Sequence, residues 1–293
     1  MKKIRLKSAL CALTVLVMSS SGLSVHAEQP AYKTYSKTVA GKAVNVAEIP
    51  KGSMSGYIAI GQNKVGGVQP MSAMAKAFSA KVAVNGTFFN AYEKQGPFLP
   101  NGNLINKGEL IHKYDNGTSF TITKDGSAQI GRIKTSISAT AHDTQHTVGV
   151  YGINRKVGAQ GIYLYTDRWG KNLGIKSGIN IMVDRDGKVI KKVSGEDAEI
   201  PQGGFVRNVS GSSSEGSTVS WKYEVSGLDN NDLMLAVGAG PMVLKNSQKI
   251  TDMQSYKDEG FTEAKILSNA GARSAIGIKP NGNIIIATTT AKV

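Results

Sequence analysis

The chain has few of the residues that would place it in a specialised class of protein. Its 293 residues include one cysteine, Cys11, and aromatic residues make up 6%. Cys11 lies inside an N-terminal apolar stretch, so the rest of the chain can form no disulfide. That stretch, residues 9–18, is too short to cross a bilayer. Apolar residues make up 40% of the sequence, so stability must come from an ordinary hydrophobic core.

Several catalytic signatures are also missing from the sequence. It contains no G-x-S-x-G nucleophile elbow, no P-loop ending in Lys-Ser/Thr, and no G-x-G-x-x-G that opens a helix. Ser/His/Asp catalysis and nucleotide binding therefore have no support. His142 and His146 stand four apart, a spacing that on a helix would offer two imidazoles to a metal. The Thr and Val residues around them favour loop and strand, so we expect no metal site and no cofactor.

The first 27 residues have the pattern of an export signal. A positive segment precedes the apolar stretch, and Val25-His26-Ala27 is a small-x-small cleavage site before Glu28. We therefore expect a bacterial protein that is secreted or cell-wall-associated, with no integral membrane segment after cleavage. The positive residues are Lys2, Lys3, Arg5 and Lys7.

Positive charge exceeds negative charge along the chain. The formal net charge is +14, and +10 remains when the four positive residues of the leader are removed. An exported protein with this balance suits wall polymers, phosphate-bearing glycans or lipid headgroups. The basic residues are dispersed apart from a mild cluster at 188–192, and they do not alternate with aromatic residues. We expect no nucleic-acid partner.

The remaining sequence predicts an α+β fold: a strand-rich single domain with few helices. Residues 28–55 form an N-terminal extension and residues 56–293 the domain. One helix is predicted with Pro70 at its first helical position and with Met71, Met74, Ala75 and Phe78 on one face. Strands are predicted at 43–46, 57–60, 119–123, 146–151, 161–165, 179–183, 218–225 and 233–237. Hairpin signals are Asn101-Gly102, Asp125-Gly126, Asp186-Gly187 and Asn281-Gly282.

The segment 81–90, Lys-Val-Ala-Val-Asn-Gly-Thr-Phe-Phe-Asn, combines a strand with a tight turn. Its β-branched residues predict a buried strand, Gly86 can take a positive φ, and Phe88 and Phe89 would brace the far side of the turn. Such a turn would hold the Asn85 side chain still. Taken alone, the same pattern is an ordinary hairpin tip.

Four further segments give this one a family context. Together the five are Asn85-Gly86-Thr87-Phe88-Phe89, then 162–170 (Ile-Tyr-Leu-Tyr-Thr-Asp-Arg-Trp-Gly), 200–206 (Ile-Pro-Gln-Gly-Gly-Phe-Val), 238–243 (Gly-Ala-Gly-Pro-Met-Val) and 272–277 (Ala-Arg-Ser-Ala-Ile-Gly). In this order and spacing, from about Gly56 to the C-terminus, they resemble the phosphodiester glycosidase family. This family includes the uncovering-enzyme type of N-acetylglucosamine-1-phosphodiester alpha-N-acetylglucosaminidase domain.

The chain departs from the family pattern mainly at its C-terminal end. Ser274 replaces the usual Thr, which is a mild change. Family members usually continue past the last core strand, here 284–288, into a helix and an acidic N-L-D-G-G turn, whereas this chain stops at Val293. The resemblance therefore implies a domain that lacks its C-terminal helix and strand, and we expect an exposed apolar patch or sheet edge there.

The resemblance implies hydrolysis of a sugar-1-phosphodiester, with a phosphate-linked sugar or wall glycan as partner. Phosphate is a good leaving group, so a cation that holds it matters more than a proton donor. The implied catalytic residues are Asn85, Arg273 and Asp167. The implied substrate-binding residues are Thr87, Phe89, Thr166, Gly238, Gly240 and Pro241. We expect Asn85, Thr166, Gly240 and Arg273 to converge on one cleft.

Competing interpretations remain open from sequence alone. Arg273 could form a surface salt bridge, and Tyr163, Tyr165 and Trp169 could be core residues rather than sugar platforms. Without the acidic turn, the chain is expected to bind substrate without appreciable turnover. The alternative functions are a non-catalytic protein that binds cell-wall glycan or exopolysaccharide, and a structural wall protein held by charge.

Overall fold

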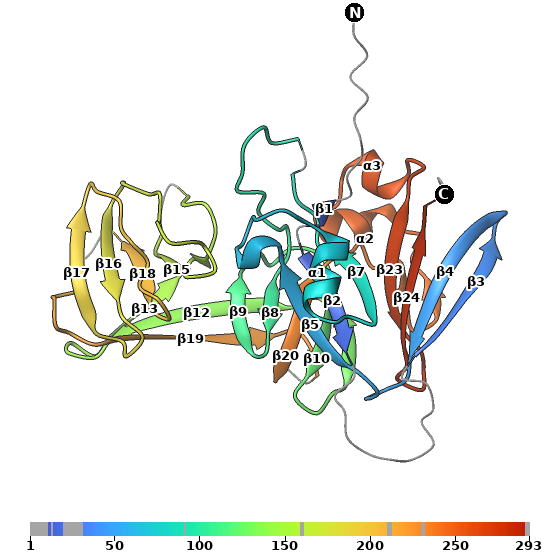
Figure 1. The fold of residues 1–293 in the computed structure, drawn as a ribbon, viewed down its shortest axis with the longest axis horizontal. Coiled ribbons are helices and arrows are strands. Elements are labelled where there is room, and N and C mark those ends of the chain that lie inside the picture. The colour runs from blue at the N-terminus through green and yellow to red at the C-terminus, as the bar shows by residue number, and fades with distance from the viewer. Residues whose placement is uncertain are drawn as a thin grey trace, which may run out of the picture.

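The computed structural model describes residues 11–12, 14–19, 32–90, 92–158, 161–209, 213–229 and 232–290. The positive segment and the cleavage site of the predicted export signal lie outside these residues. Within them, strands far outnumber helices, as the α+β prediction requires. Figure 1 shows the sheets arranged side by side along the longest axis of the molecule.

An antiparallel sheet whose strands do not follow chain order, β11-β10-β20-β8-β9, occupies the middle of the molecule and is called the central sheet below (Figure 1). β20 comes late in the sequence but lies between β10 and β8, so residues more than 100 positions apart are neighbours. The strands are β8 (Leu104–Asn106), β9 (Glu109–His112), β10 (Ser119–Thr123), β11 (Ala128–Gly131) and β20 (Leu233–Gly238).

Two long strands connect this sheet to the one drawn at the left of Figure 1. The two long strands are β12 and β19 of the three-stranded sheet β13-β12-β19. The sheet at the left of Figure 1, called the left-hand sheet below, has the order β14-β15-β18-β16-β17. The first sheet comprises β12 (Lys134–Ala141), β13 (His146–Val150) and β19 (Val219–Ser226). The second comprises β14 (Gly152–Ile153), β15 (Tyr163–Thr166), β16 (Ile179–Val183), β17 (Val189–Ser194) and β18 (Phe205–Val209).

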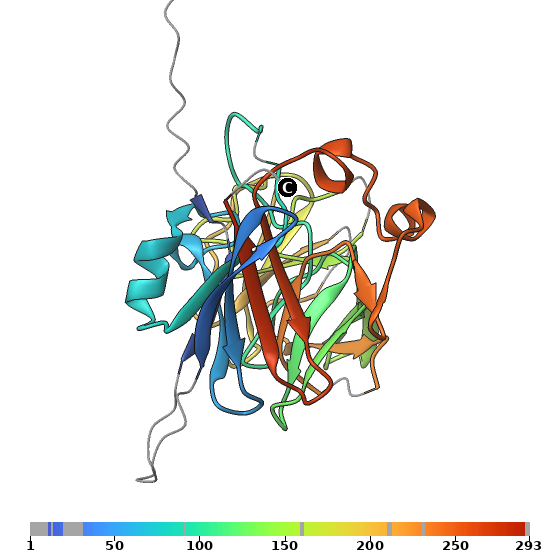
Figure 2. The same cartoon turned by 90° about the vertical axis from the view of Figure 1, so that its right-hand side faces the viewer.

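At the opposite end, the last two strands pair with the first strands of the predicted extension. The sheet has the order β23-β24-β4-β3, and Figure 2 shows β23 and β24 beside β3 and β4. Both edges of β24 are therefore paired, so this strand is not the open edge expected from the sequence. The strands are β3 (Lys33–Val39), β4 (Lys42–Ile49), β23 (Arg273–Ile278) and β24 (Ile284–Thr289).

A smaller sheet of order β5-β2-β7 carries the polar end of the segment 81–90. Its middle strand comes from the apolar stretch of the predicted leader, and α1 packs on the sheet. The elements are β2 (Thr14–Ser19), β5 (Ser55–Ile60), β7 (Val82–Gly86) and α1 (Met71–Ala77). Two-residue strands β1 (Cys11–Ala12) and β6 (Gln69–Pro70) pair nearby, and η1 (Gly61–Asn63) follows β5.

The helices are short. Pro70, predicted at the first helical position, is instead the N-cap residue that precedes α1. Asp252 caps α2 (Met253–Asp258) by accepting hydrogen bonds from the backbone N–H groups of Gln254 and Ser255. The two C-terminal helices are α2 and α3 (Ala264–Leu267). They follow the small hairpin of β21 (Leu244–Lys245) and β22 (Gln248–Lys249). Among the described residues, no helix is long and apolar enough to span a membrane.

Hydrophobic cores lie between neighbouring sheets. One core joins the small sheet, the central sheet and β24, and includes Leu104, Phe120 and Ile286. A second core runs from Ile105 in the central sheet to Ile181 in the left-hand sheet. Because the cores continue from sheet to sheet, the segments at the sheet ends are held in fixed positions relative to one another.

Several turn predictions are confirmed and two require correction. The Asp125-Gly126, Asp186-Gly187 and Asn281-Gly282 pairs form hairpin turns in which the glycine has a positive φ. In the segment 81–90, however, the residue with positive φ is Thr87, at 53°. Gly86 is required for space instead, since a Cβ there would lie 2.8 Å from the Val237 side chain.

The Asn101-Gly102 pair does not form a hairpin turn. Gly102 lies directly against Gly238, and a Cβ built on Gly238 would stand 2.5 Å from the Cα of Gly102. The backbone N–H of Gly238 donates to the Asn103 carbonyl at 2.9 Å. Two glycines are therefore needed for the loop before β8 to reach the end of β20.

We expect Gly238→Ala to destabilise the protein by about 1–3 kcal/mol, because the added methyl group would force these two backbones apart. Gly277→Ala is the matched control, since a Cβ at Gly277 meets no atom within 4 Å. Urea unfolding of both variants measures the difference. Equal stabilities for the two variants would contradict the close approach.

Candidate functional site

The first and last family-like segments meet at the ends of β7 and β23. The Ser274 hydroxyl donates a hydrogen bond to the Asn85 side-chain oxygen at 2.7 Å, although the two residues are 189 positions apart. Asn85 is the last but one residue of β7 and Ser274 the second of β23. Ser274 therefore holds the Asn85 amide in place, although the sequence indicated Ser274 only as a mild departure from the family pattern.

The loop that follows β7 closes on itself and then reaches β20. Phe89 pairs with Pro100, and the Asn101 backbone N–H donates to the Phe88 carbonyl at 2.7 Å. Phe88 packs edge-on against Phe261, with ring centroids 5.4 Å apart, and Phe89 packs against Phe98. The two rings that were expected to brace a turn therefore fix the base of a longer loop.

The glycine-rich segment 238–242 lies beside this loop and is held by a buried carboxylate. Glu259 is 6% exposed, accepts a hydrogen bond from the Thr118 hydroxyl at 2.6 Å and another from the Met242 backbone N–H at 3.0 Å. Gly240 has a φ of 104° and precedes a cis bond to Pro241. Sequence reasoning missed Glu259, because nothing near Asp258-Glu259 distinguishes one acid from the other.

Arg273 is held by its own loop. Its guanidinium donates to the carbonyl oxygens of Ala272, at 3.1 Å, and Asn269, at 2.6 Å. These contacts shape the segment between α3 and β23. Arg273 is thus close in sequence to the Ser274–Asn85 contact, but its guanidinium is engaged with main-chain oxygens.

The second and third family-like segments lie together on the left-hand sheet. β15 pairs with β18 so that Thr166 stands opposite Phe205. Tyr163 and Tyr165 are buried, which agrees with the interpretation as core residues, and Trp169 donates its indole N–H to the Leu173 carbonyl. Asp167 is exposed, in the turn that follows β15.

Thr166 is connected to the centre of the molecule through Asn154. Asn154 is fully buried, with a φ of 49°, and its side chain donates to the Thr166 hydroxyl at 2.9 Å and to the Ile111 carbonyl at 2.8 Å. Its side-chain oxygen accepts the Thr166 backbone N–H. Both polar atoms of the Asn154 side chain therefore have partners. These contacts fix the direction of the backbone that continues from Asn154 to Arg155.

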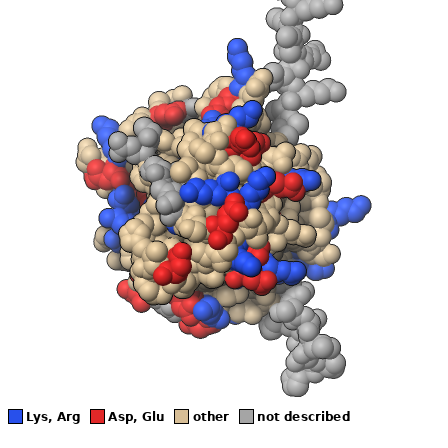
Figure 3. Space-filling model, turned by 90° about the vertical axis from the view of Figure 1, so that its left-hand side faces the viewer, with Lys and Arg blue, Asp and Glu red and all other residues tan. Residues whose placement is uncertain are grey.

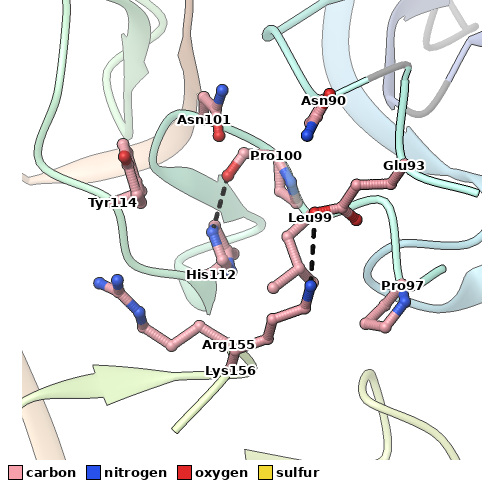
Figure 4. A pocket seen from close by; sticks show the side chains of 10 residues that line it. All are labelled: Asn90, Glu93, Pro97, Leu99, Pro100, Asn101, His112, Tyr114, Arg155 and Lys156. Atoms are coloured by element: carbon pink, nitrogen blue, oxygen red, sulfur yellow. Dashed lines mark hydrogen bonds and ion pairs between the residues drawn. The ribbon is translucent and has the colours of Figure 1, made fainter. Parts of the chain in front are cut away.

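A cavity of about 190 Å³ lies between these two groups of segments (Figure 4). The loop after β7 contributes Asn90, Glu93, Pro97, Leu99, Pro100 and Asn101, the region around β9 contributes His112 and Tyr114, and the chain after β14 contributes Arg155 and Lys156. The ammonium of Lys156 lies 3.4 Å from the Glu93 carboxylate. In Figure 4, Arg155 extends toward Tyr114, and Asn90 and Asn101 lie across the cavity from it.

Arg155 is the best-positioned cation of the cavity. Its guanidinium carbon stands 5.4 Å from the Tyr114 ring centre and 5.6 Å from that of Tyr151. The Tyr165 hydroxyl donates to the Arg155 carbonyl at 2.8 Å. Aromatic faces and a fixed backbone reduce the freedom that a long side chain would lose on binding an anion. No family-like segment includes Arg155, so sequence reasoning did not find it.

His112 forms the buried wall of the cavity. Its Nδ1 lies 2.9 Å from the Asn154 carbonyl oxygen and its Nε2 lies 3.0 Å from that of Pro100. Both neighbours are acceptors, so a neutral ring can donate to only one of them. Burial lowers the pKa of His112 from 6.5 to about 4, with the nearby Arg155 charge acting in the same direction. The ring is therefore neutral at pH 7.

Charge is not concentrated on the left-hand end of the molecule. Figure 3 shows Lys and Arg side chains there interspersed with Asp and Glu side chains. His142 and His146 lie on the β12–β13 hairpin, where the His142 ring contacts the Ser220 hydroxyl at 2.8 Å. Among the described residues, no group of three or more His, Cys, Asp or Glu side chains is arranged to hold a metal ion.

None of the residues assigned to the site from the sequence lines this cavity, and they lie in separate places in the fold. Asn85, Thr87, Phe89, Gly238, Gly240 and Pro241 belong to the loops on one side, with Arg273 at the start of β23. Thr166 is buried and connected through Asn154 to His112, which lines the cavity, and Asp167 follows it at the surface. Their assigned roles remain predictions.

We expect His112 to make stability fall as pH decreases from about 6.5 to 4. The unfolded chain takes up a proton near pH 6.5 while the folded chain resists it until about pH 4, so protonation favours unfolding in this window. The loss amounts to about 3 kcal/mol. Urea unfolding at pH 7, 5.5 and 4 measures it, with His112→Gln as control. The variant should show a shallower decline, and equal slopes would contradict the assignment.

Comparisons with known proteins agree with this architecture. A Synechocystis protein described as hypothetical is similar in structure, with a TM-score of 0.69 and 20% identity over 89% of this chain and 52% of that one. A Burkholderia pseudomallei protein, described as a predicted exported protein, has a TM-score of 0.67 and 20% identity over 86% of this chain and 63% of that one. At this identity the likeness concerns the fold.

The chain spans between about half and two thirds of the length of these two structures. No curated protein is significantly similar to it. Residues 174–292, which include β16 to β24 and three of the five family-like segments, match the model of the phosphodiester glycosidase family. The match agrees with the family resemblance over these residues, while the segments 85–89 and 162–170 lie outside it.

Proposed function

We propose that the chain is an exported protein that binds a sugar-1-phosphodiester in the described cavity and hydrolyses the bond between the sugar and the phosphate. The observation that carries the proposal is the Ser274–Asn85 hydrogen bond, because it joins the first and last family-like segments at the base of the loop that lines the cavity. The family match to residues 174–292 supports the reaction class. The predicted leader supports export.

Arg155 is assigned to the phosphate. It lines the cavity, is braced by two tyrosine rings, and has no carboxylate within ion-pair distance among the described residues. A guanidinium can donate two parallel hydrogen bonds to phosphate oxygens. Arg273, the cation implied by the family resemblance, already donates to main-chain oxygens and is assigned to holding the loop that positions Ser274.

The sugar is assigned to the side of the cavity formed by the loop after β7. Asn90 and Asn101 line that side, and amide groups both donate to and accept from sugar hydroxyls. Asn85 stands at the start of the same loop outside the cavity lining, where the Ser274 hydroxyl fixes its side-chain oxygen and helps to position the loop. Tyr114 provides an aromatic face for a sugar ring.

Hydrolysis requires water to replace the phosphate at the anomeric carbon. The water oxygen bonds to C1 as the bond from C1 to the bridging oxygen breaks, the electron pair leaves with the phosphate, and the water proton passes to a base. Glu93 is the acid among the residues that line the cavity, and its side chain is 30% exposed. We assign the base to Glu93, with Asp167, the candidate from sequence, as the competing assignment.

Arg155→Ala is expected to weaken binding of an N-acetylglucosamine phosphodiester by about 10- to 100-fold, because a charge-assisted contact with phosphate is lost. Arg155→Lys should give an intermediate loss, since an ammonium keeps the charge but not the planar fork. Calorimetric titration with an aryl-linked substrate measures both. Lys171→Ala is the matched control, because it removes one positive charge at an exposed position.

If Arg273→Ala weakens binding more than Arg155→Ala does, the phosphate contact must be assigned to Arg273 instead of Arg155. Thermal melts of both variants must accompany the titration, because Arg273→Ala also removes the contacts to Ala272 and Asn269. A variant that melts like the parent but fails to bind has lost a ligand contact rather than its fold.

Glu93→Gln is expected to lower kcat by about 10²- to 10⁴-fold with little change in KM, because the amide keeps the shape of the side chain but cannot accept the proton. Release of the aryl phosphate measures turnover. Asp167→Asn is the control and should retain most activity. If Asp167→Asn loses the activity instead, the base is Asp167.

A second function is favoured by the pairing of Glu93 with Lys156. The Lys156 ammonium occupies the carboxylate that turnover would need, and the positive net charge suits an anionic glycan. On this alternative the chain is a non-catalytic protein that binds cell-wall glycan or exopolysaccharide, with Arg155-dependent binding and no turnover. A structural wall protein held by charge would instead bind in a strongly salt-dependent way, with no preference for a sugar.

A further inference from the structure

The middle strand of the small sheet comes from the segment that is predicted to be removed on export. Residues 14–19 pair antiparallel with β5 on one edge, over six residues, and with β7 on the other, over five. The backbone N–H of Lys81 also donates to the Met18 carbonyl at 3.2 Å. The same stretch thus satisfies the backbone groups of two strands that would otherwise have open edges.

The segment fits the sheet by its side chains as well as by its backbone. Leu16 stands opposite Ile58 and Val84, and Met18 lies over Gly56, where a Cβ would be 3.4 Å from the Met18 sulfur. Leu16 and Met18 are each 1% exposed and belong to the core shared with the central sheet. Two large side chains therefore fill space that no other described segment occupies.

The other face of the sheet is covered by α1. Tyr57 and Ala83, which stand opposite Val17 in the two neighbouring strands, pack with Ala59 and with Met74 of the helix. The central strand of a sheet that is covered on both faces favours apolar residues at successive positions rather than alternating ones. The sequence Val-Leu-Val-Met at 15–18 has that pattern.

We infer that the gap between β5 and β7 is a strand-binding slot whose occupant is the leader segment 14–19. The segment completes the sheet in the uncut chain, and the slot holds or recaptures it after the chain is cut between Ser19 and Glu28. While the leader is engaged in export the slot is open, so the sheet that carries Asn85 is completed only when the segment returns.

The slot is tested with the full chain, prepared by cell-free synthesis so that the leader stays attached, and with a specific protease site in place of residues 25–27. After cutting, the N-terminal fragment should co-elute with the remainder in size exclusion, and the melting temperature should stay within a few degrees of that of the uncut chain. Mass spectrometry of the eluted peak identifies the fragment.

The double variant Leu16→Asp, Met18→Asp should release the fragment and lower the melting temperature by about 10 °C or more, because two charges cannot enter the core. The matched control is Val39→Asp, Val243→Asp, which introduces the same two charges at exposed valines. It should behave like the parent chain.

Four outcomes decide the inference. Retention of the fragment by the parent but not by the core variant supports it. Release that lowers the melting temperature, followed by recovery on adding a synthetic peptide of residues 12–20, also supports it. Release without any change in melting temperature, or equal melting of the core variant and its exposed control, overturns it.

Discussion

The contact between Gly102 and Gly238 is the constraint on which the site depends. Backbones can approach this closely only without side chains, and the approach brings the loop after β7 to the end of β20. From there, Glu259 and Phe261 hold the segment 238–242, and Phe88 packs on Phe261. Loops line the cavity, but the central sheet fixes the position of these loops, because β20 is a central strand with partners on both edges.

Local patterns in the sequence were sufficient for much of the fold. The strands at 119–123 and 179–183, the helix after Pro70 and three of the hairpin turns were predictable because each is fixed by neighbouring residues. β12 and β18 were not identified, because alternation of Ser and Thr with small apolar residues, or an arginine within a buried strand, gives a weak periodicity. Their positions are fixed by pairing with distant strands.

The candidate site was less predictable than the fold. The family-like segments indicated Asn85, and they gave Ser274 only as a departure from the family pattern; the contact between the two comes from the structure. Arg155 and His112 depend on a different arrangement: Asn154 adopts a positive φ and satisfies its side chain with Thr166 and Ile111, which turns the chain so that Arg155 reaches the tyrosine rings. No pattern of residue types at short spacing describes such a network, since its members lie on separate strands.

The leader segment illustrates why one pattern can serve two environments. An export signal requires a short apolar run, and the central strand of a sheet that is covered on both faces favours one as well. The run at 15–18 has this pattern, so the sequence predicts the first role and the structure shows the second, with Leu16 and Met18 in the core. If the export prediction holds, the two roles exclude each other in time, because a segment held by the export machinery cannot pair with β5 and β7. On our proposal, completion of the sheet beside Asn85 therefore depends on what becomes of residues 14–19.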